Sequence, residues 1–297
     1  VNGAEGFATG EDGKAAIFPV LEIRGARGLA RTYQSSPAGC YGGWISRDEL
    51  SPNYIMEMLE WMNAHIRELT WRVNPFGPQP VHLPPACRVR EDSTQVLPLD
   101  QLNDDELLRK NYKCSVRNKI KKAEKQNFKV VRASTWFDWQ QYYALYAAAL
   151  LRWGEKATSR YSLDFFRTVC DIANEHIILW LVTHRDRIIG GSLNLYQRRH
   201  CVEWHAAFDS EFFKFGVRNF LVHELVCDAM RRGYLVYDFN PSGGHEGTQA
   251  FKVSFGTQEL ASPVIRIQHP VPVARRCIGR VKRMLSRSDF KTPSVSE

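Results

Sequence analysis

The chain has 297 residues, of which 44% are hydrophobic and 12% aromatic, so it can bury a large core and is not globally disordered. The formal net charge of +8 favours anionic partners such as nucleotides, tRNA, CoA or an anionic lipid surface. Seven scattered cysteines without a CxxC pair predict reduced thiols and no metal site, and no apolar run reaches the roughly 18–20 residues of a membrane span.

The first hundred residues predict few regular elements. We expect an irregular start over residues 1–14, a strand over 15–23 and a helix that begins at Ser51-Pro52. Five prolines between residues 74 and 88 exclude a helix there and predict a connector. A short extended segment is expected over residues 96–99, before a domain boundary near residue 105.

The remainder of the chain predicts alternating helices and strands. Helices are expected over residues 106–126, 136–153, 163–173, 217–232 and 248–255. Strands are expected over residues 128–132, 177–183, 188–196, 202–208, 235–239 and 264–268. Because the middle strands form a meander between helices, the order predicts an α/β domain of the α+β type.

Four short motifs resemble those of one family. They are the basic segment from Ser115 to Lys125, the strand Gly190-Gly191-Ser192-Leu193, the run from Tyr237 to Gly244 followed by Phe251-Lys252 and Phe255-Gly256, and Tyr41-Gly42-Gly43. Together they resemble the FemAB-like proteins of the GNAT acyltransferase superfamily, which include the Fem-type transferases that add amino acids to peptidoglycan precursors. The resemblance extends from about Phe18 to Gln268, which is most of the chain.

The resemblance implies a domain organisation. It predicts a partial or degenerate GNAT-like half over residues 1–105 and a complete GNAT acyltransferase domain over residues 106–270. A basic helix and tail are expected over residues 271–297.

It also implies a function. The chain is expected to be a bacterial, cytoplasmic N-acyltransferase of cell-wall or polysaccharide biosynthesis. It would move an aminoacyl or acyl group from aminoacyl-tRNA or acyl-CoA to an amine on a cell-wall precursor, amino sugar or peptide. The donor is a co-substrate, and no tightly bound cofactor and no DNA partner are expected. The alternative is a non-catalytic RNA-binding or scaffold protein of a glycan-assembly system.

Three residues are candidates for the chemistry. No Ser-His-Asp or Cys-His spacing stands out, so direct attack by the amine is expected. Lys252 resembles the lysine that stabilises charge in the Fem reaction channel. Glu203 and His205 alternate with Trp204 along a predicted strand, which places both on one face as candidate proton acceptors.

Other residues are candidates for binding. Glycines and short polar side chains after the strand 235–239 permit close approach of a ligand. The candidate substrate residues are Tyr41, Gly42, Gly43, Arg117, Asp238, Asn240, Ser242, Gly243, Gly244, His245 and Phe251. The place that matches the CoA loop of GNAT enzymes keeps only one glycine of the usual pattern, and its candidates are Lys214, Gly216, Val217, Arg218 and Asn219.

Two basic segments leave alternatives open. The helix predicted over 106–126 is a solvated face or a platform for the phosphates of tRNA. The segment over 271–297 is an ordinary terminal helix, or a basic amphipathic helix that touches the inner membrane surface near a lipid-linked acceptor. The sequence does not specify an oligomeric state.

Overall fold

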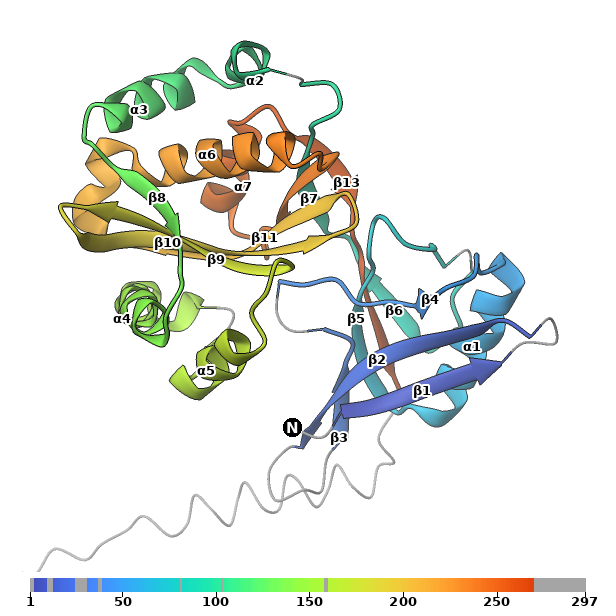
Figure 1. The fold of residues 1–297 in the computed structure, drawn as a ribbon. Coiled ribbons are helices and arrows are strands. Elements are labelled where there is room, and N and C mark those ends of the chain that lie inside the picture. Colours follow the sequence, from blue (N-terminus) through green and yellow to red (C-terminus); the bar gives the residue numbers. More distant parts are fainter. Residues whose placement is uncertain are drawn as a thin grey trace, which may run out of the picture.

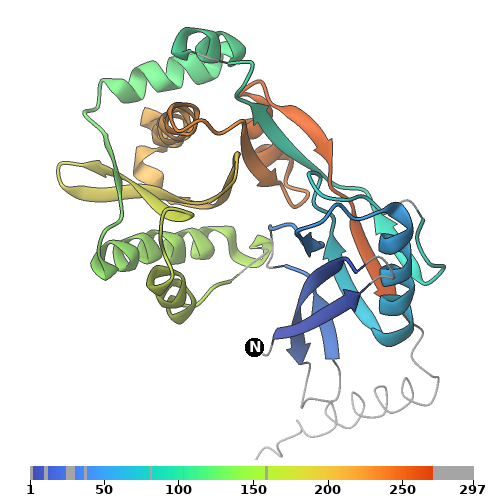
Figure 2. The same cartoon turned by 45° about the vertical axis from the view of Figure 1, so that its right-hand side comes forward.

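The computed structural model describes residues 3–9, 13–24, 31–36, 39–80, 82–102, 104–157 and 160–269. The described chain forms two lobes, each built around its own sheet (Figures 1 and 2). The predicted tail over 271–297 lies outside the described residues. No helix in the described ranges is long and apolar enough to cross a membrane.

The N-terminal lobe holds a seven-stranded sheet in the order β1-β2-β3-β5-β14-β6, with β4 paired to β2. Its strands are β1 (Gly3–Thr9), β2 (Ala15–Arg24), β3 (Arg31–Gln34), β4 (Ile45–Ser46), β5 (Glu68–Arg72), β6 (Cys87–Arg90) and β14 (Val264–Gln268). Helix α1 (Pro52–His65) begins as predicted, because the Ser51 side chain accepts a hydrogen bond from the Tyr54 N–H at 3.2 Å. The buried side of α1 packs with residues of β2 and β5 in one apolar cluster.

The C-terminal lobe holds the second seven-stranded sheet, in the order β13-β7-β12-β11-β10-β9-β8. Its strands are β7 (Ser93–Pro98), β8 (Lys129–Arg132), β9 (Ile177–His184), β10 (Arg187–Gln197), β11 (His200–Phe208), β12 (Val236–Pro241) and β13 (Gln258–Ala261). The helices are α2 (Asp105–Asn111), α3 (Cys114–Glu124), α4 (Trp136–Trp153), α5 (Leu163–Asp171), α6 (Val217–Arg231) and α7 (Glu246–Val253). The mixed α/β class is confirmed.

Helices cover both faces of this second sheet. Residues of α2, α3 and α6 pack against one face in a cluster that includes Leu108, Ile120 and Leu225. Residues of α4 and α5 pack against the other face, where Tyr142 and Phe166 are buried. Figure 1 shows α3 and α6 above the sheet and α4 and α5 below it.

Strands β11 and β12 are the parallel pair of the second sheet. They pair only over residues 200–202 and 236–238, and they diverge beyond that point. A parallel pair that diverges leaves room between its carboxyl ends for side chains from both strands. The candidate site is built at this place.

Three sequence expectations are corrected by the fold. The irregular start is wrong for residues 3–9, because backbone pairing with β2 makes them a strand. The single helix over 106–126 is wrong, because the chain leaves the helix at Tyr112, whose side chain is buried. The sheets do not separate at residue 105, since β7 belongs to the second sheet and β14 to the first. Strands β1, β3, β4, β5, β6 and β13 were not predicted.

Candidate active site

A buried cluster of charged side chains lies where β11 and β12 diverge. Glu203 comes from β11, Arg218 from the first turn of α6 and Lys252 from α7. Lys252 is only 5% exposed and Glu203 is 7% exposed, so both charges lie away from bulk water. Ionisable groups that are buried together in this way are typical of reaction centres.

The charges of the cluster act on one another. Burial raises the pKa of the Glu203 carboxyl above its ordinary value, and the positive charges of Arg218 and Lys252 oppose that rise. Burial lowers the pKa of the Lys252 ammonium to about 8, the Glu203 carboxylate opposes this, and Arg218 adds to it. Lys252 therefore changes its charge close to physiological pH.

A β-bulge separates Glu203 from His205. On β11 these two residues oppose Asn194 and Leu193, which are adjacent on β10, so Trp204 is the extra residue. Glu203 consequently faces α6, whereas His205 packs among Tyr142, Tyr146 and Phe166 of α4 and α5. The predicted shared face is wrong, because one inserted residue reverses the alternation of side chains.

His205 is half-buried and packs against the aromatic side chains of α4. The Tyr142 hydroxyl lies 2.6 Å from His205 Nδ1, and burial lowers the pKa of the imidazole to about 4. The ring is therefore neutral at physiological pH.

Backbone geometry at Asn240 positions Lys252. Asn240 has a φ of 64°, which turns the chain sharply at the end of β12. The Lys252 ammonium donates a hydrogen bond of 2.5 Å to the Asn240 carbonyl oxygen. The buried Asn240 Oδ1 has no hydrogen-bond partner, so it is available to a ligand donor.

Asp238 joins the two lobes. Its fully buried carboxylate accepts hydrogen bonds from the Tyr41 hydroxyl at 2.8 Å, the Thr94 hydroxyl at 2.8 Å and the Asn240 N–H at 2.7 Å. His200 Nε2 lies 3.2 Å from the same carboxylate. Tyr41, from the N-terminal lobe, is thereby held beside the charged cluster.

A cavity of about 310 Å³ opens in the N-terminal lobe next to Tyr41. It is lined by Tyr41, Gly42, Gly43, Trp44 and Trp71, among others. Three residues of its lining each carry a buried polar atom without a hydrogen-bond partner: Ser35 Oγ, Trp44 Nε1 and Trp71 Nε1. Unpartnered donors in an aromatic-lined cavity are the usual arrangement for a polar ligand that has flat apolar faces.

The segment Gly39–Tyr41 connects the cavity to the charged cluster. Cys40 and Tyr41 line the cavity, while a Cβ on Gly39 would lie 3.4 Å from Asn240 Nδ2. A ligand in the cavity therefore lies close to the end of β12.

The residues predicted to bind the acyl donor do not lie together on one surface. Val217 is fully buried, Asn219 is buried, and Lys214 is exposed on the 3-10 turn η3 (Ser210–Phe215). The Arg218 guanidinium lies 3.8 Å from the centre of the Phe251 ring and belongs to the charged cluster instead. The role of these residues in donor binding stays a prediction.

Gly216 is required by packing. Its φ is 79°, and a Cβ there would lie 2.5 Å from the Lys119 carbonyl oxygen of α3. We expect Gly216→Ala to lower the free energy of unfolding by about 1–3 kcal/mol, because backbone strain and overlap add. Gly233→Ala is the matched control, since Gly233 has a φ of 76° and open space around it. Equal urea midpoints for the two variants would show that the overlap with α3 adds nothing to the loss of stability.

The other substrate candidates divide into two groups. The Arg117 guanidinium donates to the Tyr112 carbonyl oxygen and so ends α2, outside the charged cluster. Gly243, Gly244 and His245 are exposed in the turn after β12, and Ser242 is half-buried there. The binding roles of both groups stay predictions.

Sequence reasoning missed several residues of the site. Thr94 and His200 bind Asp238, and Ser35, Trp44 and Trp71 line the cavity. Thr94 lies in a polar stretch just before the apolar residues Val96 and Leu97, which gives no signal for a site. The tryptophans read as core residues, and only the three-dimensional structure shows that their N–H groups lack partners.

The sequence matches one family model. The model describes an acetyltransferase (GNAT) domain and matches residues 110–253. These residues include Glu203, Arg218 and Lys252, and exclude the cavity of the N-terminal lobe. A search of curated proteins gives no significant match.

Several solved structures have a similar fold over most of the chain. FemX is 14% identical with a TM-score of 0.65, and the match covers 89% of this chain and 88% of FemX. L-PGS from Bacillus licheniformis is 11% identical with a TM-score of 0.58, covering 93% of this chain and 88% of that one. The C-terminal domain of a putative lysylphosphatidylglycerol synthetase from Agrobacterium fabrum is 10% identical with a TM-score of 0.58, covering 89% and 84%.

Proposed function

We propose that this chain, an acyltransferase with a GNAT-type domain over residues 110–253 and a FemX-like two-domain fold, transfers an aminoacyl or acyl group to an amine by direct attack. The observation that carries the proposal is the buried cluster of Glu203, Arg218 and Lys252 where β11 and β12 diverge. Acyl transfer needs a proton acceptor for the amine and a positive charge for the oxyanion, and the cluster contains both.

The proposed reaction needs no covalent enzyme intermediate. The amine nitrogen forms a bond to the carbonyl carbon of the donor, and the Lys252 ammonium stabilises the oxyanion that develops. The Glu203 carboxylate accepts the amine proton. The bond to the leaving oxygen or sulfur then breaks, and the leaving group receives that proton.

The environments of the thiols support direct attack. Burial raises the pKa of Cys40 to about 12 and that of Cys201 to about 12. Burial also raises the pKa of Cys87 and Cys170. Raised pKa values keep a thiol protonated and a poor nucleophile at neutral pH.

The cavity beside Tyr41 is the proposed acceptor site. Its unpartnered Ser35 hydroxyl and Trp44 and Trp71 N–H groups suit the oxygens of a sugar or peptide. Tyr41 reaches from the cavity to Asp238 on β12, so an amine that extends past Tyr41 approaches the charged cluster. A cell-wall precursor, an amino sugar or a peptide has this combination of polar body and free amine.

Aminoacyl-tRNA is the proposed donor, with acyl-CoA as the alternative. The name of one structurally similar protein, a putative lysylphosphatidylglycerol synthetase, denotes a lysyl group joined to phosphatidylglycerol, which supports an aminoacyl donor and permits a lipid-linked acceptor. The exposed lysines Lys119, Lys121 and Lys122 of α3 also favour a polyanionic donor such as tRNA, because they can contact its phosphates.

The test measures binding and transfer with both donors. Purified chain is mixed with charged tRNA, uncharged tRNA or acetyl-CoA, each at low and at physiological salt, and transfer to an amino sugar or peptidoglycan precursor is followed by mass spectrometry. We expect saturable binding that is tighter for charged than for uncharged tRNA and that weakens with salt. Binding and transfer with acetyl-CoA alone would replace the tRNA donor. Failure of transfer with both would favour a scaffold or RNA-binding protein.

A further inference from the structure

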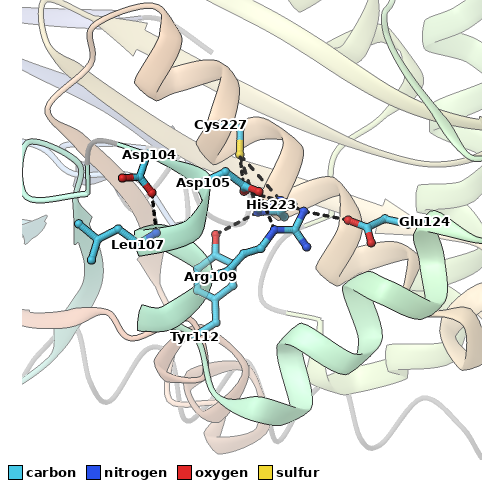
Figure 3. A network of polar contacts seen from close by, with 8 residues as sticks. All are labelled: Asp104, Asp105, Leu107, Arg109, Tyr112, Glu124, His223 and Cys227. Carbon is cyan, nitrogen blue, oxygen red and sulfur yellow. Dashed lines mark hydrogen bonds and ion pairs between the residues drawn. The ribbon is translucent and has the colours of Figure 1, made fainter.

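Three side chains of different chemistry meet on the face of the C-terminal lobe that carries α2 and α6. Asp105 lies in the first turn of α2, and His223 and Cys227 lie one turn apart on α6. Residues four apart on a helix project from the same side, so both α6 side chains point toward Asp105. Figure 3 shows the three side chains gathered at this joint.

The spacing of their ligand atoms fits a tetrahedral ion. Asp105 Oδ1 lies 3.2 Å from His223 Nε2 and 3.8 Å from Cys227 Sγ. Cys227 Sγ lies 3.9 Å from His223 Nε2. Tetrahedral zinc with ordinary bond lengths to sulfur, nitrogen and oxygen holds its ligand atoms about 3.3–3.6 Å apart. Shifts of a few tenths of an ångström would close the triangle around an ion.

The donor set selects the kind of ion. A thiolate, an imidazole and a carboxylate suit zinc and disfavour magnesium and calcium, which prefer oxygen ligands alone. The His223 side chain is 2% exposed, whereas that of Asp105 is 55% exposed. An ion therefore enters from the Asp105 side, where water completes the fourth position.

Arg109 lies at the edge of the group formed by Asp105, His223 and Cys227. One of its terminal nitrogens, Nη2, lies 2.8 Å from His223 Nε2 and 2.8 Å from Glu124 Oε1, while its Nε binds Asp105 Oδ2 at 2.8 Å. The guanidinium competes for the imidazole lone pair, yet Glu124 can hold it after it withdraws from His223. The nearby carboxylates Asp105, Glu124 and Glu224 outnumber the guanidinium groups Arg109 and Arg231, so the region has a small excess of negative charge.

We propose that Asp105, His223 and Cys227 form a binding site for a thiophilic divalent cation, Zn²⁺, which ties α2 to α6 away from the charged cluster of the active site. Arg109 lowers the affinity of this site by competing for His223. Bound zinc stabilises the joint between the two helices, because it binds the folded chain in preference to the unfolded one.

The test uses Co²⁺ as a spectroscopic substitute for zinc in the full chain after removal of metal with a chelator. We expect wild-type protein to give the ultraviolet charge-transfer band of a cobalt thiolate and the visible bands of tetrahedral Co²⁺. Addition of Zn²⁺ should abolish these bands and raise the Tm of the wild-type chain by about 3 °C or more at saturation.

Four variants make the result specific. Cys227→Ser should lose the thiolate band. Asp105→Asn, at an exposed position, should weaken Co²⁺ binding at least about tenfold. Cys114→Ser is the matched control, because Cys114 is an exposed thiol on α3. Arg109→Gln should bind Co²⁺ at least about tenfold more tightly, since a competing positive charge is removed. The absence of tetrahedral bands in the wild type, or their persistence in Cys227→Ser, would overturn the proposal.

Discussion

Replacing Lys252 with alanine is expected to lower kcat for acyl transfer by about 10²-fold or more, the effect of losing one oxyanion donor. Lys252 is nearly buried, and its ammonium is held by the Asn240 carbonyl at the end of β12. A charge held in place before the reaction stabilises the oxyanion without reorganisation, so its removal affects the transition state more than substrate binding. Steady-state kinetics should therefore show a fall in kcat with little change in KM.

Controls separate chemistry from folding. Lys252→Met fills the same space without the charge, and it should lose kcat as strongly as Lys252→Ala while it stays folded at the assay temperature, as circular dichroism can show. Lys129→Ala removes an exposed lysine of β8 on the same lobe and should retain full activity. An unchanged kcat in Lys252→Met would remove Lys252 from the mechanism.

The same lysine predicts a pH dependence. Burial lowers the pKa of Lys252 to about 8, so its ammonium form, which stabilises the oxyanion, is lost as the pH rises through that value. We expect kcat to decline above about pH 8 in the wild-type chain, and the descending limb to be absent in Lys252→Met. A limb that persists in the variant would belong to another group.

Apolar patterns predicted some elements of both lobes well. Helix α4 of the C-terminal lobe and strand β14 of the N-terminal lobe have the bounds that the sequence indicates. The break between α2 and α3 could not be read in the same way. The basic pattern continues through Tyr112, and only tertiary packing of its ring shows that the helix stops there.

At the candidate site, the sequence predicted which residues matter better than it predicted where their side chains point. Lys252 was selected from its motif and Glu203 from its place on a predicted strand, and the structure brings both to one buried cluster. His205 was placed beside Glu203 by strict alternation, which fails at the bulge that Trp204 introduces. A bulge depends on the register with β10, so a single strand sequence cannot reveal it.

Contacts between distant segments were the least predictable. His223 and Cys227 stand four residues apart in the sequence, which was a visible signal, but Asp105 joins them only through the packing of α2 on α6. Likewise Tyr41 was chosen from a Y-G-G motif, while its contact with Asp238, 197 residues away, follows from the assembly of the two lobes.

That contact leads to the largest expected effect on stability. Replacing Asp238 with alanine should lower the free energy of unfolding by about 3–5 kcal/mol, as is typical when one partner of a buried charged network is removed. Three donors lose their acceptor at once: the Tyr41 hydroxyl, the Thr94 hydroxyl and the Asn240 N–H. The Thr94 hydroxyl and the Asn240 N–H are buried, so little water can replace the carboxylate for these two donors.

The measurement is the urea midpoint of purified variants, followed by circular dichroism. Asp171→Ala is the matched control, because Asp171 forms only an exposed ion pair with Arg167 on α5 and should cost less than about 1 kcal/mol. Asp238→Asn should fall between the two, since one amide oxygen still accepts while the amide nitrogen faces donors. A loss below about 1 kcal/mol in Asp238→Ala would mean that the two lobes are held together elsewhere. A large loss would make Asp238 the residue that keeps the acceptor cavity aligned with Lys252, because Tyr41 and Asn240 bind the same carboxylate.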